Sequence, residues 1–244
     1  MEALAAAFWG FVGGAALLIG ALIGIYGGAS RQVIAGVMAL GAGVLVSSVA
    51  FELMDEAYKA GGFDAASLGL LSGALTFFLA DREVGRRGGR HRKRSGDQQQ
   101  SGSATAIAIG ALMDGIPESA AIGVSLIGGG KIGAALVAAV FLSNVPEGLS
   151  SAAGAKRAGR STTRILALWG AVALASAVAA LLGYLFLAGA SGNTIAAIQA
   201  FAAGAILTML ASTMMPEAYG EGGPVVGVVT SVGFLLAFIL SHLA

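Results

Sequence analysis

Long apolar stretches recur along the chain, separated by short clusters of glycine, charge and polar residues. They fall at about residues 3–26, 33–58, 63–80, 105–128, 131–155, 165–188, 192–219 and 223–243. A transmembrane helix needs roughly 20 predominantly apolar residues, and these stretches are too continuous for the alternation of a β-barrel. The pattern therefore predicts an all-α integral membrane protein with eight transmembrane helices in one domain, residues 1–244. The first stretch has no basic segment before it and is expected to be a retained helix.

The amino-acid composition is also typical of an integral membrane protein. Of the residues, 57% are hydrophobic and 11% are charged, whereas about a quarter are charged in a soluble domain. The 39 glycines suit helices whose backbones approach closely in a bilayer. The chain has no cysteine, which excludes disulfides, thiolate ligands and a catalytic thiol.

The basic residues predict the orientation. Twelve of the 14 Lys and Arg residues fall in the first, third and fifth loops of the eight-helix arrangement, and only Lys59 and Lys131 fall in the others. By the positive-inside rule those three loops face the cytoplasm and both termini are extracytoplasmic, here across the plasma membrane. The third loop, 81–104, carries seven cations among polar residues and is expected to be a disordered tether near anionic lipid.

Two internal similarities suggest inverted repeats. The second helix ends Met-Asp-Glu-Ala-Tyr (54–58) and the seventh ends Met-Pro-Glu-Ala-Tyr (215–219), each followed by a pair of glycines. The fourth and fifth helices share a polar residue, two intervening positions, then Pro-Glu and a small residue. Helices 1–3 are therefore expected to repeat as 6–8, and helix 4 as helix 5, in opposite directions, the pattern of many secondary carriers.

The Pro-Glu helices contain the candidate chemistry. Residues i and i+4 share a helix face, so Asp114 projects with Glu118 and Ser143 projects with Glu147. The intervening prolines also release a backbone carbonyl. A charge at the bilayer centre costs about 2.5–3.5 kcal/mol, and no Lys or Arg lies in the interior of either helix. The carboxylates must be protonated, hydrated or paired with a cation, and a bound divalent cation also explains their convergence.

At these residues the chain resembles the ZIP family of divalent-metal transporters. The motif Ser-Asn-Val-Pro-Glu-Gly (143–148) is similar to that family's His-Asn-x-Pro-Glu-Gly, and Asp-Gly-Ile-Pro-Glu-Ser (114–119) is its counterpart in the preceding helix. The resemblance extends over the whole length, with the long polar loop after the third helix. It implies an elevator-type carrier that moves metal into the cytoplasm, and a possible homodimer.

The resemblance also implies a set of site residues. The metal positions are Asp114, Glu118, Ser143, Asn144 and Glu147, with Glu52 contributing from the second helix. Every histidine of the family pattern is replaced here. The family default is zinc, whereas an all-oxygen site also suits manganese or iron(II).

Other functions stay open at this point. A proton-coupled carrier of another substrate could use the same carboxylates as relays. A non-transporting membrane metal sensor would bind the ion and pass none. An intramembrane metallohydrolase would need a ligand set of the His-Glu-x-x-His kind, which is absent from the sequence. We therefore expect no enzymatic activity, no resident cofactor and no nucleic-acid partner; the expected partners are a divalent metal ion and the lipid bilayer.

Overall fold

The computed structural model describes residues 1–93, 95, 104–127 and 134–243, and the part of the chain that it describes is helical without strands. The helices run in this order: α1 Glu2–Tyr26, α2 Arg31–Ser48, η1 Val49–Met54, α3 Asp55–Val84, η2 Gly85–Gly89, α4 Ala104–Ser125, α5 Ala134–Arg157, α6 Thr162–Leu187, α7 Gly192–Met209, η4 Leu210–Met214, α8 Met215–Gly222 and α9 Val225–Leu243. The elements labelled η are short π-helical turns.

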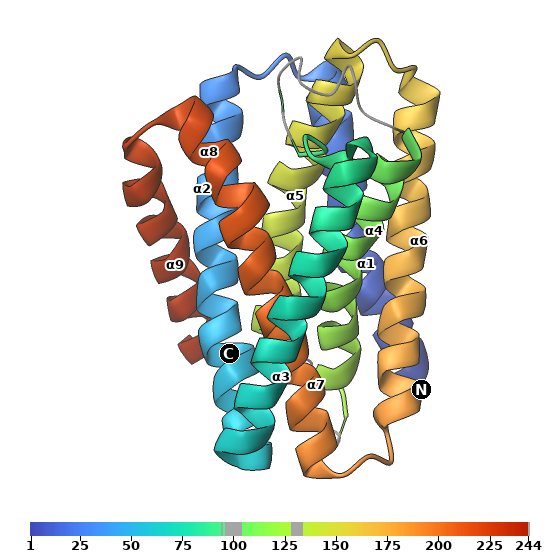
Figure 1. Ribbon diagram of the computed structural model, residues 1–244, viewed down its shortest axis with the longest axis vertical. Coiled ribbons are helices and arrows are strands. Elements are labelled where there is room, and N and C mark those ends of the chain that lie inside the picture. Colours follow the sequence, from blue (N-terminus) through green and yellow to red (C-terminus); the bar gives the residue numbers. More distant parts are fainter. Residues whose placement is uncertain (94, 96–103, 128–133, 244) are drawn as a thin grey trace.

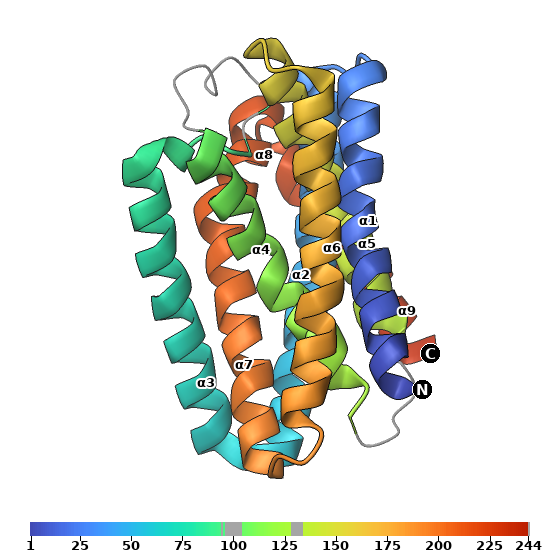
Figure 2. The ribbon, with the colours of Figure 1, turned by 90° about the vertical axis from the view of Figure 1, so that its right-hand side faces the viewer.

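The long helices form one elongated bundle (Figures 1 and 2). Helix α1 packs against α5 and α6, α2 packs against α9, and α3 packs against α7. Helix α4 contacts α1, α6 and α7, so it lies within the bundle rather than at its rim. The apolar side chains on the outside include many Leu, Val and Phe residues, as expected for helices that face lipid.

Seven helical stretches in the described residues are long and apolar enough to cross a membrane. The sequence predicted eight, and the difference lies in Arg31–Gly89, which is one helical run of 59 residues. This run is interrupted at Gly62, whose φ of 72° and ψ of −171° are not helical. Only glycine adopts such a conformation readily, because it has no Cβ. The apolar helices give the chain the character of a multi-pass membrane protein.

Glycine allows the closest helix contacts. A Cβ at Gly20 of α1 would overlap the carbonyl oxygen of Val145 in α5, and a Cβ at Gly148 of α5 would overlap the carbonyl oxygen of Leu17 in α1. The two helices therefore approach backbone to backbone over this region. Such contact replaces the hydrophobic driving force that helices lack in lipid, and it fixes the position of the Pro-Glu segment of α5 against α1.

The basic segments gather at one end of the bundle. The α1–α2 and α5–α6 connections and the end of α3 all lie at the upper end in Figure 1, and both chain termini lie toward the other end. The expectation that residues 81–104 are disordered is wrong for the described residues 81–93, 95 and 104. Helix α3 continues to Val84, η2 follows to Gly89, and Arg92, Lys93 and Ser95 are buried. The rest of that loop lies outside the described residues.

Candidate functional site

The acidic residues of the two Pro-Glu helices meet inside the bundle. Asp114 and Glu118 come from α4, with Pro117 between them, and Glu147 follows Pro146 in α5. The three carboxylates are 1–4% exposed. The structure therefore brings together inside the bundle the three acids that the sequence singled out.

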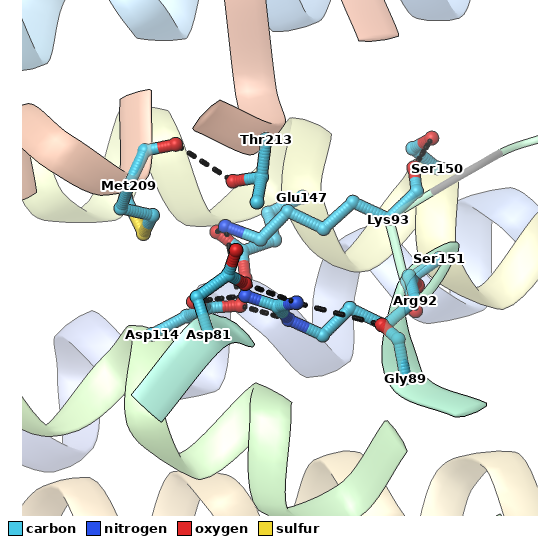
Figure 3. A network of polar contacts seen from close by, with 10 residues as sticks. All are labelled: Asp81, Gly89, Arg92, Lys93, Asp114, Glu147, Ser150, Ser151, Met209 and Thr213. Atoms are coloured by element: carbon cyan, nitrogen blue, oxygen red, sulfur yellow. Dashed lines mark hydrogen bonds and ion pairs between the residues drawn. The ribbon is translucent and has the colours of Figure 1, made fainter. Parts of the chain in front are cut away.

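The cation among these acids comes from the protein itself (Figure 3). The Nζ of Lys93 lies 3.0 Å from Oε2 of Glu147 and 3.3 Å from Oδ2 of Asp114. Arg92 donates to the same aspartate through Nε at 2.9 Å and Nη2 at 3.0 Å. Its Nη1 lies 2.8 Å from Oδ1 of Asp81 in α3. Lys93 thus bridges α4 to α5, and Arg92 bridges α4 to α3.

Both basic side chains keep their charge in this setting. Burial by itself lowers the pKa of Lys93, but Asp114 and Glu147 raise that pKa by more, so it stays above its ordinary value. Burial also lowers the pKa of Arg92, but the contacts of its guanidinium with Asp114 and Asp81 raise that pKa by more. The pKa of Arg92 therefore lies above its ordinary value. The site therefore consists of carboxylates neutralised by an ammonium and a guanidinium, each 3–4% exposed.

Glu118 is the one acid of the three without a partner among the described residues. Both of its carboxyl oxygens are buried and make no hydrogen bond there. It lies close enough to Glu147, Lys93 and Asp114 to interact with all of them electrostatically. A buried polar group without a partner is costly, with typical penalties of about 1–3 kcal/mol, and such groups in native structures often mark a site that binds something.

The backbone of the inserted segment is held by side chains of α5. Ser151 donates a hydrogen bond to the carbonyl oxygen of Arg92 and Ser150 donates one to that of Lys93, each at 2.6 Å. Arg157 Nη1 donates to the carbonyl oxygen of Ser95 at 2.5 Å. These contacts place the two cations deep in the bundle although they belong to a loop.

Helix α8 holds the same segment from another side. The backbone N–H and the hydroxyl of Ser95 donate to Oε1 of Glu217 at 2.9 and 3.3 Å. Glu217 is 2% exposed. Glu56, its counterpart in the similar segment at the start of α3, is exposed.

The other predicted site residues have different neighbours. Ser143 is buried and its hydroxyl donates to the carbonyl oxygen of Val140 in its own helix at 2.9 Å. The amide nitrogen of Asn144 donates to the carbonyl oxygen of Gly13 in α1 at 2.9 Å. Glu52 lies on η1, partly exposed, where it interacts electrostatically with His242. In the described structure Glu52 makes no ion pair or hydrogen bond with the buried acids.

The sequence predicted no basic partner for the buried acids within their own helices, and their basic partners come from another segment, the loop before α4. Arg92, Lys93 and Ser95 were missed as site residues because they belong to a polar loop. A signal for them did exist, since buried acids require a counter-charge and the segment just before α4 carries seven cations. Among the described residues no three His, Asp or Glu side chains are grouped closely enough to hold a metal ion, and the Lys93 ammonium lies among the acids instead.

No protein-family model matches the chain, and no curated protein matches it either. The site is therefore interpreted from its own geometry and chemistry.

Proposed function

We propose that this chain is a ZIP-type secondary transporter that moves a divalent metal ion into the cytoplasm through the acids of α4 and α5. The observation that carries the proposal is the cation between these acids. Oxygens of Asp114 and Glu147 lie within 3.3 Å of one ammonium nitrogen. A pocket that neutralises a positive charge in the middle of an apolar bundle is chemically suited to bind a cation.

The third acid is what favours a divalent ion. Glu118 is buried beside the other two and hydrogen-bonded to nothing in the described structure. A monovalent ammonium needs one negative charge, whereas a divalent ion is neutralised by two and accepts several oxygen ligands. Zinc is the ion implied by the family resemblance. Asp114, Glu118 and Glu147 are not grouped closely enough to hold an ion while Lys93 lies between two of them. If they closed around an ion, their oxygen-only set would suit manganese and iron(II) as well.

Two further features support the inverted repeats and the eight-helix topology. Gly62 follows α2 and η1, and Gly223 follows α7 and η4; the two glycines have φ of 72° and 65° with ψ of −171° and −156°. Their helices also pair reciprocally, since α2 packs on α9 while α3 packs on α7. In the proposed topology the run Arg31–Gly89 crosses the membrane twice, with its reversal at Gly62. The basic end faces the cytoplasm and both termini face outward, in the plasma membrane.

The test is uptake into proteoliposomes containing the purified full chain. Zinc, manganese, iron(II), cobalt, cadmium and magnesium are each offered outside, and uptake is measured for the wild type, Glu118→Gln, Glu147→Gln and Glu83→Gln. Glu83 is a matched control, because it is half exposed and pairs with Arg87 on the surface of α3. We expect saturable uptake of at least one ion, reduced about a hundredfold or more in the two site variants and unchanged in the control.

Two results would contradict the proposal. One is a folded wild-type protein that passes none of the six ions under an ion gradient or a membrane potential. A protein that binds an ion without passing it would favour the metal sensor instead. The other is uptake that survives both substitutions in α4 and α5, which would place the pathway elsewhere in the bundle.

A further inference from the structure

The loop before α4 places a side-chain cation where a substrate cation would bind. Lys93 reaches oxygens of both Asp114 and Glu147, at 3.3 and 3.0 Å. A divalent metal bound to those oxygens would lie about 2.0–2.6 Å from them. The ammonium and the metal ion would therefore occupy overlapping positions and compete for the same negative charge.

The insertion is held by specific contacts. Three separate side chains of α5 donate hydrogen bonds to backbone carbonyl oxygens of the loop. The donors are Ser150, Ser151 and Arg157. Glu217 of α8 accepts two more from Ser95. Four of these five contacts use backbone groups of the loop, and together they form a seat that positions Arg92, Lys93 and Ser95.

From these contacts we propose that Lys93 is a tethered competitor of the transported ion, which keeps the site neutral and closed until the loop withdraws. This inference rests on the proposed function, because it concerns the regulation of the same site. Withdrawal of Lys93 uncovers the oxygens of Asp114 and Glu147, and a divalent ion replaces the ammonium. The Ser95–Glu217 contact breaks in the same movement, which links occupancy of the site to the position of the loop on α8.

The competition has a measurable consequence for affinity. When only a fraction of the molecules can bind a ligand, the apparent dissociation constant increases by the inverse of that fraction. If the inserted loop is favoured by about ten to one, removal of the ammonium tightens metal binding about tenfold. Neutralising a lysine elsewhere on the protein changes nothing at the site.

The first experiment measures binding of Zn²⁺ and Mn²⁺ to the purified full chain by isothermal titration calorimetry. It compares the wild type with Lys93→Met and with Lys59→Met. The control lysine is exposed on α3 and pairs with Asp55 one turn away. Methionine has nearly the length of lysine and no charge. We expect Lys93→Met to bind at least one of the two ions about tenfold more tightly, and Lys59→Met to match the wild type.

The outcomes separate this inference from the proposed function. Equal or weaker binding by Lys93→Met, with metal still bound by the wild type, overturns the competitor alone. Failure of all three proteins to bind either ion overturns the proposed function, and the competitor with it.

A second experiment locks the loop without altering Lys93. The chain has no cysteine of its own, so Ser95→Cys with Glu217→Cys gives a unique pair that a short bis-methanethiosulfonate reagent can bridge. We expect the bridged protein to lose Zn²⁺ and Mn²⁺ binding and to regain it when the bridge is reduced. Undiminished binding in the bridged protein overturns the competitor.

Discussion

Arg87 in η2 and Arg92 just after it provide a test of what burial does to an ion pair. Arg92 contacts Asp114 at 2.9 Å with the two side chains 3% and 1% exposed, and Arg87 contacts Glu83 at 2.7 Å with the two 69% and 50% exposed. The two ion pairs have similar distances, but the first is buried and the second is exposed. Arg92→Met and Arg87→Met therefore remove the same charge from two environments.

The expected loss of stability depends on the charge that each substitution leaves without a partner. Removing one partner of a buried ion pair costs about 3–5 kcal/mol, because the remaining charge is desolvated without compensation. After Arg92→Met, Asp114 keeps Lys93 at 3.3 Å, and Asp81 is 27% exposed and can be hydrated. We therefore expect Arg92→Met to lower the free energy of unfolding by about 3 kcal/mol, the lower end of that range. Arg87→Met removes a surface pair and should cost about 0–1 kcal/mol.

Unfolding in mixed detergent micelles can measure the difference. The denaturant midpoint is followed by the fluorescence of Trp9 and Trp169, the two tryptophans of the chain; Trp169 is buried at the α6 core. Circular dichroism of the folded variants serves as a control for retained helix. If the two substitutions lower the free energy of unfolding equally, or Arg92→Met by less than about 1 kcal/mol, then the buried network does not hold the loop as we argue.

Two further predictions concern helix packing and the seat of the loop. A Cβ at Gly43 would overlap a backbone oxygen of α9, whereas Gly36 in the same helix has open space; Gly43→Ala should destabilise the protein by about 1–3 kcal/mol or more. Gly36→Ala should stabilise it by about 0.5–1 kcal/mol, and equal unfolding midpoints would contradict the packing. Replacing Ser150 and Ser151 by alanine removes two hydrogen bonds worth about 0.5–1.5 kcal/mol each. In a Ser95→Cys background this should speed maleimide labelling about five- to a hundredfold, and an unchanged rate would show that the serines do not hold the loop.

The sequence was sufficient for the features that depend on local pattern. The length of each apolar run predicts a helix that could span a bilayer. In lipid an unpaired backbone N–H or C=O group is costly, and a helix pairs all of them within one segment. The spacing of Asp114 and Glu118 places both on one face of α4, since that follows from 3.6 residues per turn. The same reasoning indicated that buried acids without a basic partner in their own helices need a cation.

The identity of that cation was decided by tertiary structure. Lys93 lies 54 positions before Glu147 in the chain, and its contact with that residue depends on where the loop passes between α4 and α5. Composition favours disorder for such a loop, because polar residues rarely bury enough apolar surface to fold alone. Here the described part of the loop is held by groups on other helices. Glu52, which the resemblance had placed at the site, makes no ion pair or hydrogen bond with the buried acids in the described structure. The periodicity of the sequence determines which residues share a helix face. Whether a buried carboxylate is compensated by a basic partner depends on contacts between segments that are distant in the chain, and only the tertiary structure decides these.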